Sequence, residues 1–259
     1  MSATAVRVSP GWLRLREPAD AAARSEELAG RVVRRLPAAG RLVVHDLGGG
    51  TGAMGRWLAP RFDRPQHWVV HDRDPELLEL AVAGAPVSTE ARRSDVTRLA
   101  PADLAGADLV VASALLDLLT ADGLERMLAA CAGLPMLLAL TVVGRVTLAP
   151  ADPLDAAIGA AFDAHQRRGG LLGPDAVATA AEALRAKGAE PVVRPSPWRL
   201  GAAEAELVAE WLEGWVAAAC EQEPALAAEA GPYRDRRLAQ AAAGELAVTV
   251  EHADLLVLP

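Results

Sequence analysis

Short apolar runs alternate with segments of helical periodicity between residues 41 and 144 of this 259-residue chain. Within the helical segments, apolar side chains recur every three or four residues, as in Leu124, Met127 and Leu128. Strands that alternate with helices predict a parallel sheet covered on both faces, built with right-handed crossovers. The expected strands cover residues 41–46, 67–72, 87–94, 107–115 and 136–144.

Helical patterns dominate on both sides of this alternating region. Residues 12–36 carry an apolar stripe that predicts a helical segment before the first strand. Several helices are also expected after residue 146, before a final apolar strand at 246–259. We therefore expect one domain over residues 1–259. Its parts are a helical cap (1–39), a cofactor-binding core (40–145), and substrate-side helices with the last two strands (146–259).

Composition excludes several classes of protein. The formal net charge is −8, which argues against a dedicated nucleic-acid binder, because such proteins need a basic surface. Both cysteines, Cys131 and Cys220, lie in apolar helical patterns and are expected to be reduced and buried. No Cys/His cluster has zinc-ligand spacing, so no metal is expected.

Targeting signals are not evident either. The first residues, MSATAVRVSPGW, lack the apolar core of a signal peptide, and no apolar run reaches the roughly 18 residues of a membrane span. We expect a cytoplasmic protein with a small-molecule substrate and no membrane partner. The pattern leaves the oligomeric state open.

The segment LVVHDLGGGTG, residues 42–52, is the most informative stretch of the chain. An apolar run ends in Asp46, a glycine-rich turn follows, and apolar residues then recur at helical spacing. Glycines allow a ligand to lie against bare backbone, and a helix N-terminus offers unpaired N–H groups. A strand, a glycine turn and a helix together are typical of nucleotide-like cofactor sites.

Two registers of this turn imply two cofactors. Gly50, Gly52 and Gly55 match the GxGxxG pattern of dinucleotide-binding proteins, with Asp72 about 20 residues on, and would indicate an NAD(P)-dependent oxidoreductase. That register leaves Asp46 inside the strand, where an unpaired buried carboxylate is costly. The second register begins at Asp46 and continues through Gly48, Gly50 and Gly52. It puts the acid at the strand end, facing a cationic ligand, and is favoured.

The second register resembles motif I of the class I S-adenosylmethionine-dependent methyltransferases. Three later segments also resemble that family in order and spacing, namely VVHDRDPELLELA, RRSDVTRL and ADLVVASALLDLL, and the likeness covers residues 40–145. The resemblance implies an α/β fold with a Rossmann-like seven-stranded sheet in the order 3-2-1-4-5-7-6. Its last strand is antiparallel, which suits the apolar C-terminal run.

The resemblance also implies a role for each matched residue around S-adenosyl-L-methionine. Asp72 would bind the ribose hydroxyls, Asp95 and Val96 would contact the adenine, and Ser113 would lie near the cofactor. Arg24, on the helical cap, would bind the methionine carboxylate. The alternative for Arg24 is a solvated arginine or an ion pair with Asp20. The complete set of expected cofactor-binding residues is Asp46, Gly48, Gly50, Gly52, Asp72, Asp95, Val96, Ser113 and Arg24.

Two residues are candidates for catalysis. His165 lies on the apolar face of a helix beyond the fifth strand and could deprotonate an acceptor, or could be a hydrogen-bonded histidine at the core edge. Asp117 follows the fourth strand and could orient a nucleophile or cap the next helix. Trp211 and Trp215 could form the floor of a pocket for an aromatic substrate, although their helical spacing favours packing in the core.

These observations favour methyl transfer to a small organic acceptor by O- or N-methylation. The sulfonium already activates the methyl group, so alignment and exclusion of water are the main requirements. The Asn/Asp-Pro-Pro-aromatic motif of many amide and nucleobase N-methyltransferases is absent from the sequence. Two alternatives remain, an NAD(P)-binding oxidoreductase and a non-catalytic S-adenosylmethionine-binding module.

Overall fold

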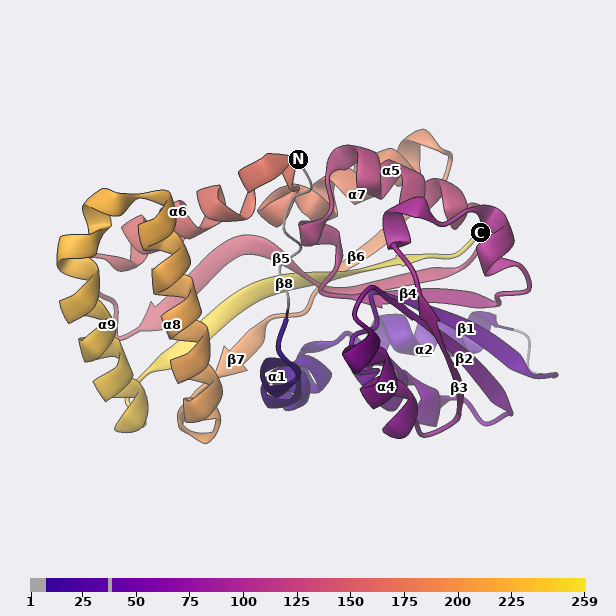
Figure 1. Cartoon of the computed structure of the whole chain (residues 1–259), viewed down its shortest axis with the longest axis horizontal. Coiled ribbons are helices and arrows are strands. Elements are labelled where there is room, and N and C mark those ends of the chain that lie inside the picture. Colours follow the sequence, from indigo (N-terminus) through magenta and orange to yellow (C-terminus); the bar gives the residue numbers. More distant parts are fainter. Residues whose placement is uncertain (1–7, 37–38) are drawn as a thin grey trace.

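A single mixed sheet organises the molecule. The computed structural model describes residues 8–36 and 39–259, and the strands follow the order β3-β2-β1-β4-β5-β8-β6, with β7 paired to β8 (Figure 1). Neighbours among β1–β5 are parallel, and β8 is antiparallel to β5, β6 and β7. The strands are β1 Leu42–Leu47, β2 Gln66–Asp72, β3 Ser88–Arg93, β4 Leu109–Ser113, β5 Met136–Ala149, β6 Val192–Pro195, β7 Trp198–Leu200 and β8 Ala247–Val257.

The predicted Rossmann-like order and the antiparallel last strand are confirmed, but the described sheet has eight strands rather than seven. The sequence PVVRPSPW, residues 191–198, predicts one short strand that runs into a proline-rich turn. Pairing with β8 instead resumes at Trp198 to form β7. Pro195 and Pro197 cannot donate backbone hydrogen bonds, so the ladder divides into β6 and β7.

Nine α-helices pack on this sheet within the described ranges. The predicted cap over residues 12–36 is two helices rather than one, because Arg24 turns the chain and the Ser25 hydroxyl caps the second helix at Leu28 N. The helices are α1 Pro10–Ala23, α2 Glu26–Arg35, α3 Ala53–Leu58, α4 Pro75–Ala83, α5 Ala121–Ala130, α6 Asp155–Gln166, α7 Ala176–Ala186, α8 Ala205–Gln222 and α9 Ala227–Ala242.

The two faces of the central sheet are covered by different helices. Leu109 and Val111 of β4 pack with α2 and α3, whereas Val110 and Ala112 pack with α5 and α7. This alternation follows from the two-residue repeat of a strand buried on both sides. The carboxyl ends of β1, β2 and β4 therefore meet at one edge of a rigid layer.

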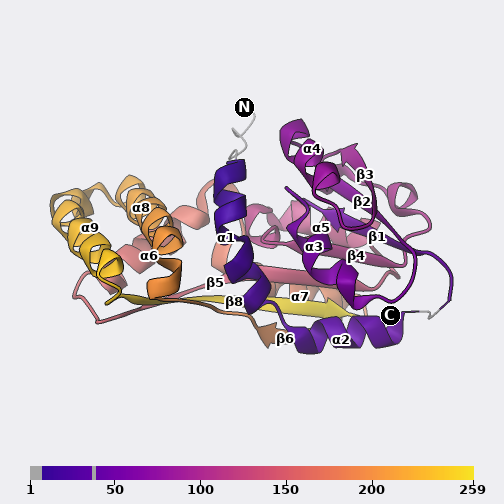
Figure 2. The same ribbon diagram turned by 90° about the horizontal axis from the view of Figure 1, so that it is seen from below.

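A second, helical lobe is built on the long ends of β5 and β8. These two strands run beyond the parallel sheet, and α6, α8 and α9 pack against the extension around Ile158, Leu212 and Trp215 (Figure 1). Helix α1 stands between this lobe and the helices of the parallel sheet (Figure 2). The space beside α1 is thus bounded by both lobes.

No helix among the described residues is long and apolar enough to cross a membrane.

Candidate functional site

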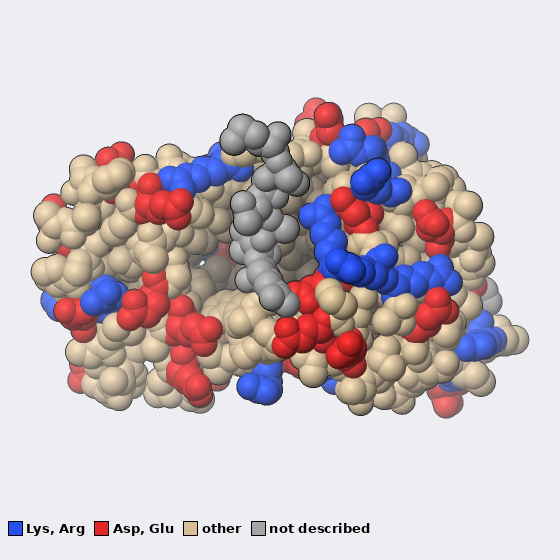
Figure 3. Space-filling model, in the orientation of Figure 1, with Lys and Arg blue, Asp and Glu red and all other residues tan. Residues whose placement is uncertain are grey.

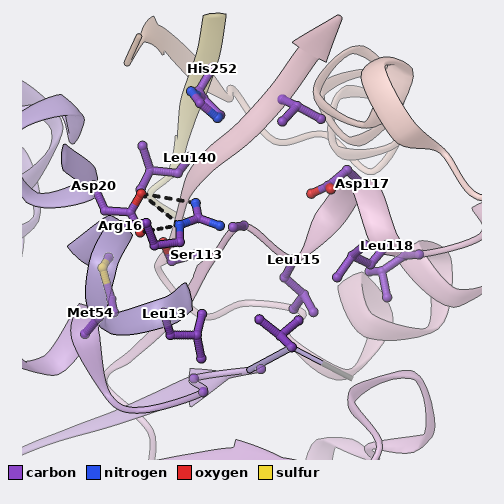
Figure 4. Close-up of a pocket in the computed structure, with 18 of the residues that line it drawn as sticks. Leu13, Arg16, Asp20, Met54, Ser113, Leu115, Asp117, Leu118, Leu140 and His252 are labelled. Atoms are coloured by element: carbon purple, nitrogen blue, oxygen red, sulfur yellow. Dashed lines mark hydrogen bonds and ion pairs between the residues drawn. The ribbon is translucent and has the colours of Figure 1, made fainter. Parts of the chain in front are cut away.

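A large cavity lies where the ends of β1, β2 and β4 face α1 and the helical lobe. Its volume is about 960 Å³, near the upper end of the roughly 300–1,000 Å³ typical of small-molecule sites. Its lining combines the glycine turn with residues of α1, β5, β7, β8, α6 and α8. Side chains from both lobes therefore meet in one space (Figure 4).

The glycine turn forms one end of this cavity. β1 stops at Leu47, so the turn begins at Gly48, as the register starting at Asp46 requires. Gly48 and Gly50 have φ of +64° and +55°, a region that favours glycine. At Gly49 an added Cβ would lie 2.7 Å from Val70 Cγ1 and 2.8 Å from the Asp46 carboxylate. Glycine at this position therefore allows the turn to pack closely on β1 and β2, and residues 48–50 line the cavity with backbone alone.

Arg56 ties this turn to α1. Its guanidinium donates to the Thr51 carbonyl oxygen and forms two hydrogen bonds with Glu17 of α1, at 2.7 and 2.6 Å. The position of α1 over the cavity is thus coupled to the turn itself.

Asp46 lines the cavity with a fully buried carboxylate. Neither of its oxygens has a hydrogen-bond partner. Desolvation by burial raises the pKa of Asp46 to about 7, opposed by the positive charge of Arg24. A buried carboxylate without a partner is costly unless a ligand completes it. A cationic hydrogen-bond donor would therefore complete the Asp46 carboxylate.

Arg24 supplies the complementary charge. Its side chain is buried, and Nη2 donates to Ser113 Oγ at 3.1 Å, while Nε and Nη1 have no partner. Burial lowers the pKa of Arg24, whereas nearby Asp20 raises it. The alternative of a solvated arginine or an Asp20 ion pair is not found, because Asp20 pairs with Arg16. The ammonium and carboxylate of one amino acid would satisfy both Asp46 and Arg24.

Asp72 lies at the end of β2 and lines the cavity beside the turn. Its carboxylate accepts hydrogen bonds from Gly50 N and Asp74 N, both at 2.9 Å. Each oxygen keeps a further lone pair, so the carboxylate can also accept from ligand hydroxyls.

Asp95 and Val96 were expected together, but only Val96 lines the cavity. Asp95 caps a short helical turn by accepting from Thr97 N at 2.9 Å and pairs with Arg73 at 2.7 Å. Burial works to raise the pKa of Asp95, but the hydrogen bonds from Arg73 and Thr97 outweigh it and hold that pKa below its usual range. Gly52 is also outside the lining, since it caps α3 and packs against Ala81 of α4.

A network between α1 and β7 forms the wall on the opposite side of the cavity. Arg16 binds both oxygens of Asp20, with an Nε–Oδ2 distance of 2.9 Å (Figure 4). Trp198 Nε1 donates to the same Asp20 carboxylate at 2.9 Å, and the Arg16 guanidinium lies 4.9 Å from the Trp198 ring centre. Arg16 and Trp198 each contact Asp20 and also each other, so both residues are held in place by more than one contact.

Two further polar side chains line the cavity, and each has one atom that makes no hydrogen bond. Asp117 Oδ1 and His252 Nδ1 are buried and make no hydrogen bond. Burial raises the pKa of Asp117 to about 6 and lowers that of His252 to about 3. At neutral pH, Asp117 is a carboxylate able to accept a proton and His252 a neutral imidazole.

His165 lies apart from this space. It does not line the cavity, and its imidazole contacts Gln166 at 3.4 Å and Glu221 of α8 at 3.3 Å. The structure thus brings Asp117, and not His165, to the cavity wall. Neither Arg16 nor Trp198 is assigned to the site by the sequence pattern, and Asp20 enters there only as a possible partner of Arg24. Arg16 and Asp20 are four residues apart on one helix, a spacing that the sequence does show. The contact of Asp20 with Trp198 joins residues 178 positions apart, so no local pattern could reveal it.

The surface charges and the possible metal ligands add two observations. On the face shown in Figure 3, basic side chains gather in an arc to the right of the centre of the view, and acidic side chains lie within and below that arc. In the described part of the chain, no group of three or more His, Cys, Asp or Glu residues could hold a metal ion.

Comparison with known proteins agrees with this architecture. Residues 44–134 match a family described as a methyltransferase domain. No curated protein matches the chain. The cyclopropane synthase MmaA2 from Mycobacterium tuberculosis superposes with a TM-score of 0.50 and 15% identity, covering 97% of this chain and 95% of that one. This likeness establishes a shared fold.

A second solved structure shows a weaker likeness. The S-adenosylmethionine-dependent methyltransferase from Geobacter sulfurreducens, in complex with S-adenosyl-L-homocysteine, has a TM-score of 0.48 and 14% identity. The match covers 97% of this chain and 98% of that one.

Proposed function

We propose that this chain is a class I S-adenosylmethionine-dependent methyltransferase that methylates an oxygen or nitrogen of a small organic acceptor. The observation that carries the proposal is the division of the cavity into two unsatisfied ends. The opposite charges of Asp46 and Arg24 lie near the glycine turn, whereas Asp117 lines the cavity from the segment after β4 and His252 from β8.

The end beside the glycine turn suits the methyl donor. In this proposal Asp46 accepts from the methionine ammonium and Arg24 donates to its carboxylate. Asp72 accepts from the ribose hydroxyls, and Val96 packs against the adenine. When bound, S-adenosylmethionine supplies a methyl group already activated by the sulfonium. The chain then has to align the acceptor and exclude water.

The other end suits an acceptor that donates a hydrogen bond. Asp117 offers an unpartnered carboxylate oxygen, and His252 offers a buried ring nitrogen. A hydroxyl or amine satisfies such groups, whereas a carbon–carbon double bond leaves both unpaired at a cost of about 1–3 kcal/mol each. This supports O- or N-methylation rather than attack by carbon.

Asp117 is the proposed proton acceptor. Its pKa, raised to about 6, lies close enough to neutrality for the carboxylate to take a proton during transfer. His252, with a pKa lowered to about 3, is better suited to orient the acceptor as a neutral group. His165, the other candidate from the sequence, is hydrogen-bonded outside the cavity lining.

The size of the acceptor is inferred from the enclosure of its site. The aromatic side chains of Phe162, Trp198 and Trp211 bound the cavity on the side of the helical lobe. A folded polymer would not fit behind them, whereas a small organic molecule would.

Calorimetry and a methyl-transfer assay test the proposal together. S-adenosylhomocysteine should bind with micromolar or tighter affinity, and NAD(H) should not bind. Methyl-labelled cofactor incubated with fractions of small metabolites should give a labelled product that disappears with Asp117→Asn. NAD(H) binding would support the oxidoreductase alternative. Persistent absence of labelled product despite cofactor binding would support a non-catalytic binding module.

A further inference from the structure

Flat apolar surfaces surround the acceptor end of the cavity. Trp12 of α1, Phe162 of α6, Trp198 of β7 and Trp211 of α8 all line it. Trp198 is fixed in place, because its ring meets Trp12 edge-on at 6.4 Å and His252 at 5.2 Å. Aromatic walls held in this way favour a planar body that can stack on them.

Arg16 brings a positive charge to the same end. Its side chain is only 14% exposed, and its Nε and Nη2 groups bind Asp20. Within the described residues, Nη1 takes part in no hydrogen bond. The Asp20 carboxylate also accepts from Trp198, which disperses its negative charge. Arg16 therefore keeps a fixed donor for a further oxygen.

The charge of Arg16 reaches both polar groups that face the acceptor. Its positive charge opposes the rise that burial causes in the pKa of Asp117, and adds to the fall that burial causes in the pKa of His252. Asp117 lies in a short helical turn after β4 and His252 on β8, so both are far from α1 in the sequence. In Figure 4, Arg16 and Asp117 enter the cavity from opposite sides. An acceptor lying between them meets a hydrogen-bond acceptor on one side and a guanidinium on the other.

A hydroxyl is the group that satisfies both neighbours at once. Its proton can be donated to Asp117 while its oxygen accepts from Arg16. An ammonium would be repelled by Arg16, and the positive charge would favour an acidic hydroxyl by stabilising its anion. Building on the proposed function, we infer that the acceptor is a planar, weakly acidic hydroxyl compound of the phenol or enol class.

The resulting transfer is balanced. The acceptor O–H proton passes to the Asp117 carboxylate, and the oxygen lone pair forms the new O–CH₃ bond. The S–CH₃ bond breaks with its electron pair remaining on sulfur, so neutral S-adenosylhomocysteine and a methyl ether are the products. Arg16 stabilises the negative charge that develops on oxygen.

Three matched probes test the acceptor class: 2-naphthol, 2-naphthylamine and 2-methylnaphthalene. Each is titrated into the protein saturated with S-adenosylhomocysteine, and binding is followed by quenching of tryptophan fluorescence. We expect 2-naphthol to bind at least tenfold more tightly than the other two, and to be the one methylated with S-adenosylmethionine. Equal or tighter binding of the amine, or of the hydrocarbon, would overturn the inference.

The ionisation of bound 2-naphthol provides a signature specific to Arg16. Its absorbance titration should shift to lower pH on binding by about one unit or more, as expected for an acid beside a cation. Arg16→Gln should abolish the shift. Arg14→Gln, at an exposed position of the same helix outside the cavity lining, should retain it. An unshifted titration in the unsubstituted protein would refute the role of Arg16.

Other charged or titratable groups line the same space. They are identical in the unsubstituted protein, Arg16→Gln and Arg14→Gln. They are Asp20 of α1, Arg24, Asp117, Arg145 of β5, Asp163 of α6, and Glu251 and His252 of β8.

The inference and the proposed function can be refuted separately. Loss of the naphthol preference with intact S-adenosylhomocysteine binding overturns only the acceptor class, whereas absence of S-adenosylhomocysteine binding overturns the function itself.

Discussion

Asp254 of β8 holds Leu140 of β5 in a left-handed backbone conformation. Its Oδ1 accepts from Leu140 N at 2.8 Å, and Leu140 has φ of +54°, where the pairing of β5 with β8 shifts register. Oδ2 of the same carboxylate accepts from Ser25 N at 2.8 Å, directly after Arg24. One buried side chain therefore fixes two walls of the cavity, Leu140 and the corner that carries Arg24.

Asp254→Asn should weaken cofactor binding. The amide can accept only one of the two backbone hydrogen bonds and presents a donor to the other N–H, at a cost of about 1–3 kcal/mol. We expect the affinity for S-adenosylhomocysteine to fall about tenfold by calorimetry, with a matching loss of stability to urea. Unchanged affinity in a destabilised variant would show that Asp254 serves folding alone.

Arg237→Ala is the control for Asp254→Asn, because it should reduce stability without changing the cavity. Arg237 is 1% exposed and binds both oxygens of Asp155 at 2.6 Å, joining α9 to α6 outside the cavity lining. Removing it takes the guanidinium from Asp155, whose side chain is 19% exposed and still accepts from the Tyr233 hydroxyl and from Asp152 N. The loss should therefore lie at or below the lower end of the roughly 3–5 kcal/mol that breaking a fully buried ion pair costs. Urea unfolding should show this loss, while S-adenosylhomocysteine affinity, measured well below the transition, stays within twofold of the original. A large change in affinity would mean that the helical lobe controls the cofactor end.

Asp46→Asn should stabilise the ligand-free protein in a pH-dependent way. The pKa of Asp46 is about 7 when folded and near 3.8 when unfolded, so between these values only the unfolded chain has lost the proton. The free energy of unfolding should therefore fall as pH rises, by up to about 1.4 kcal/mol per pH unit. Above pH 7 this loss levels off.

Asparagine carries no such titration. The stability advantage of Asp46→Asn over the unsubstituted protein should grow between pH 5 and 7 and then remain constant. Urea unfolding at pH 5, 6, 7 and 8 measures it. At the same time the affinity for S-adenosylhomocysteine should fall in the variant. An advantage that is constant over this pH range would contradict the assigned titration.

Arg24→Ala should weaken only ligands that carry the amino-acid tail. Loss of a charge-assisted contact to the methionine carboxylate costs about 1.5–3 kcal/mol, roughly 10- to 150-fold in affinity. Methylthioadenosine lacks the tail, so its affinity should be unchanged. Equal losses for S-adenosylhomocysteine and methylthioadenosine would instead indicate a general disturbance of the site.

Asp72→Asn should weaken both of those ligands. Its carboxylate is assigned to the ribose, which both contain, and the expected cost is about 1–3 kcal/mol. Calorimetry with the two ligands separates this behaviour from that of Arg24→Ala. Retention of full affinity for methylthioadenosine would place the ribose elsewhere.

The alternating α/β core and the glycine turn could be inferred from local patterns, whereas the strand order was implied by the resemblance to the methyltransferase family. Apolar runs and helical repeats marked the parallel core, and the end of β1 at Leu47 agrees with the register that begins at Asp46. The division of the edge segment between Val192 and Leu200 into β6 and β7 depended on pairing with β8, whose partner residues lie 48 to 64 positions away. Short strands at such an edge are set by their neighbours rather than by their own composition.

The chain's own residue pattern thus predicted the fold class and a nucleotide-like cofactor, because a strand, a glycine turn and a helix are adjacent in sequence and form that end of the cavity locally. The resemblance to the methyltransferase family indicated S-adenosylmethionine as this cofactor. The acceptor end was decided only by tertiary structure. Arg16, Asp117, Trp198 and His252 come from four separate elements and meet because β5 and β8 extend beneath the helical lobe. The burial of these side chains, and the atoms of Asp117 and His252 that make no hydrogen bond, result from that packing. Neither property can be recognised in any single segment of the sequence.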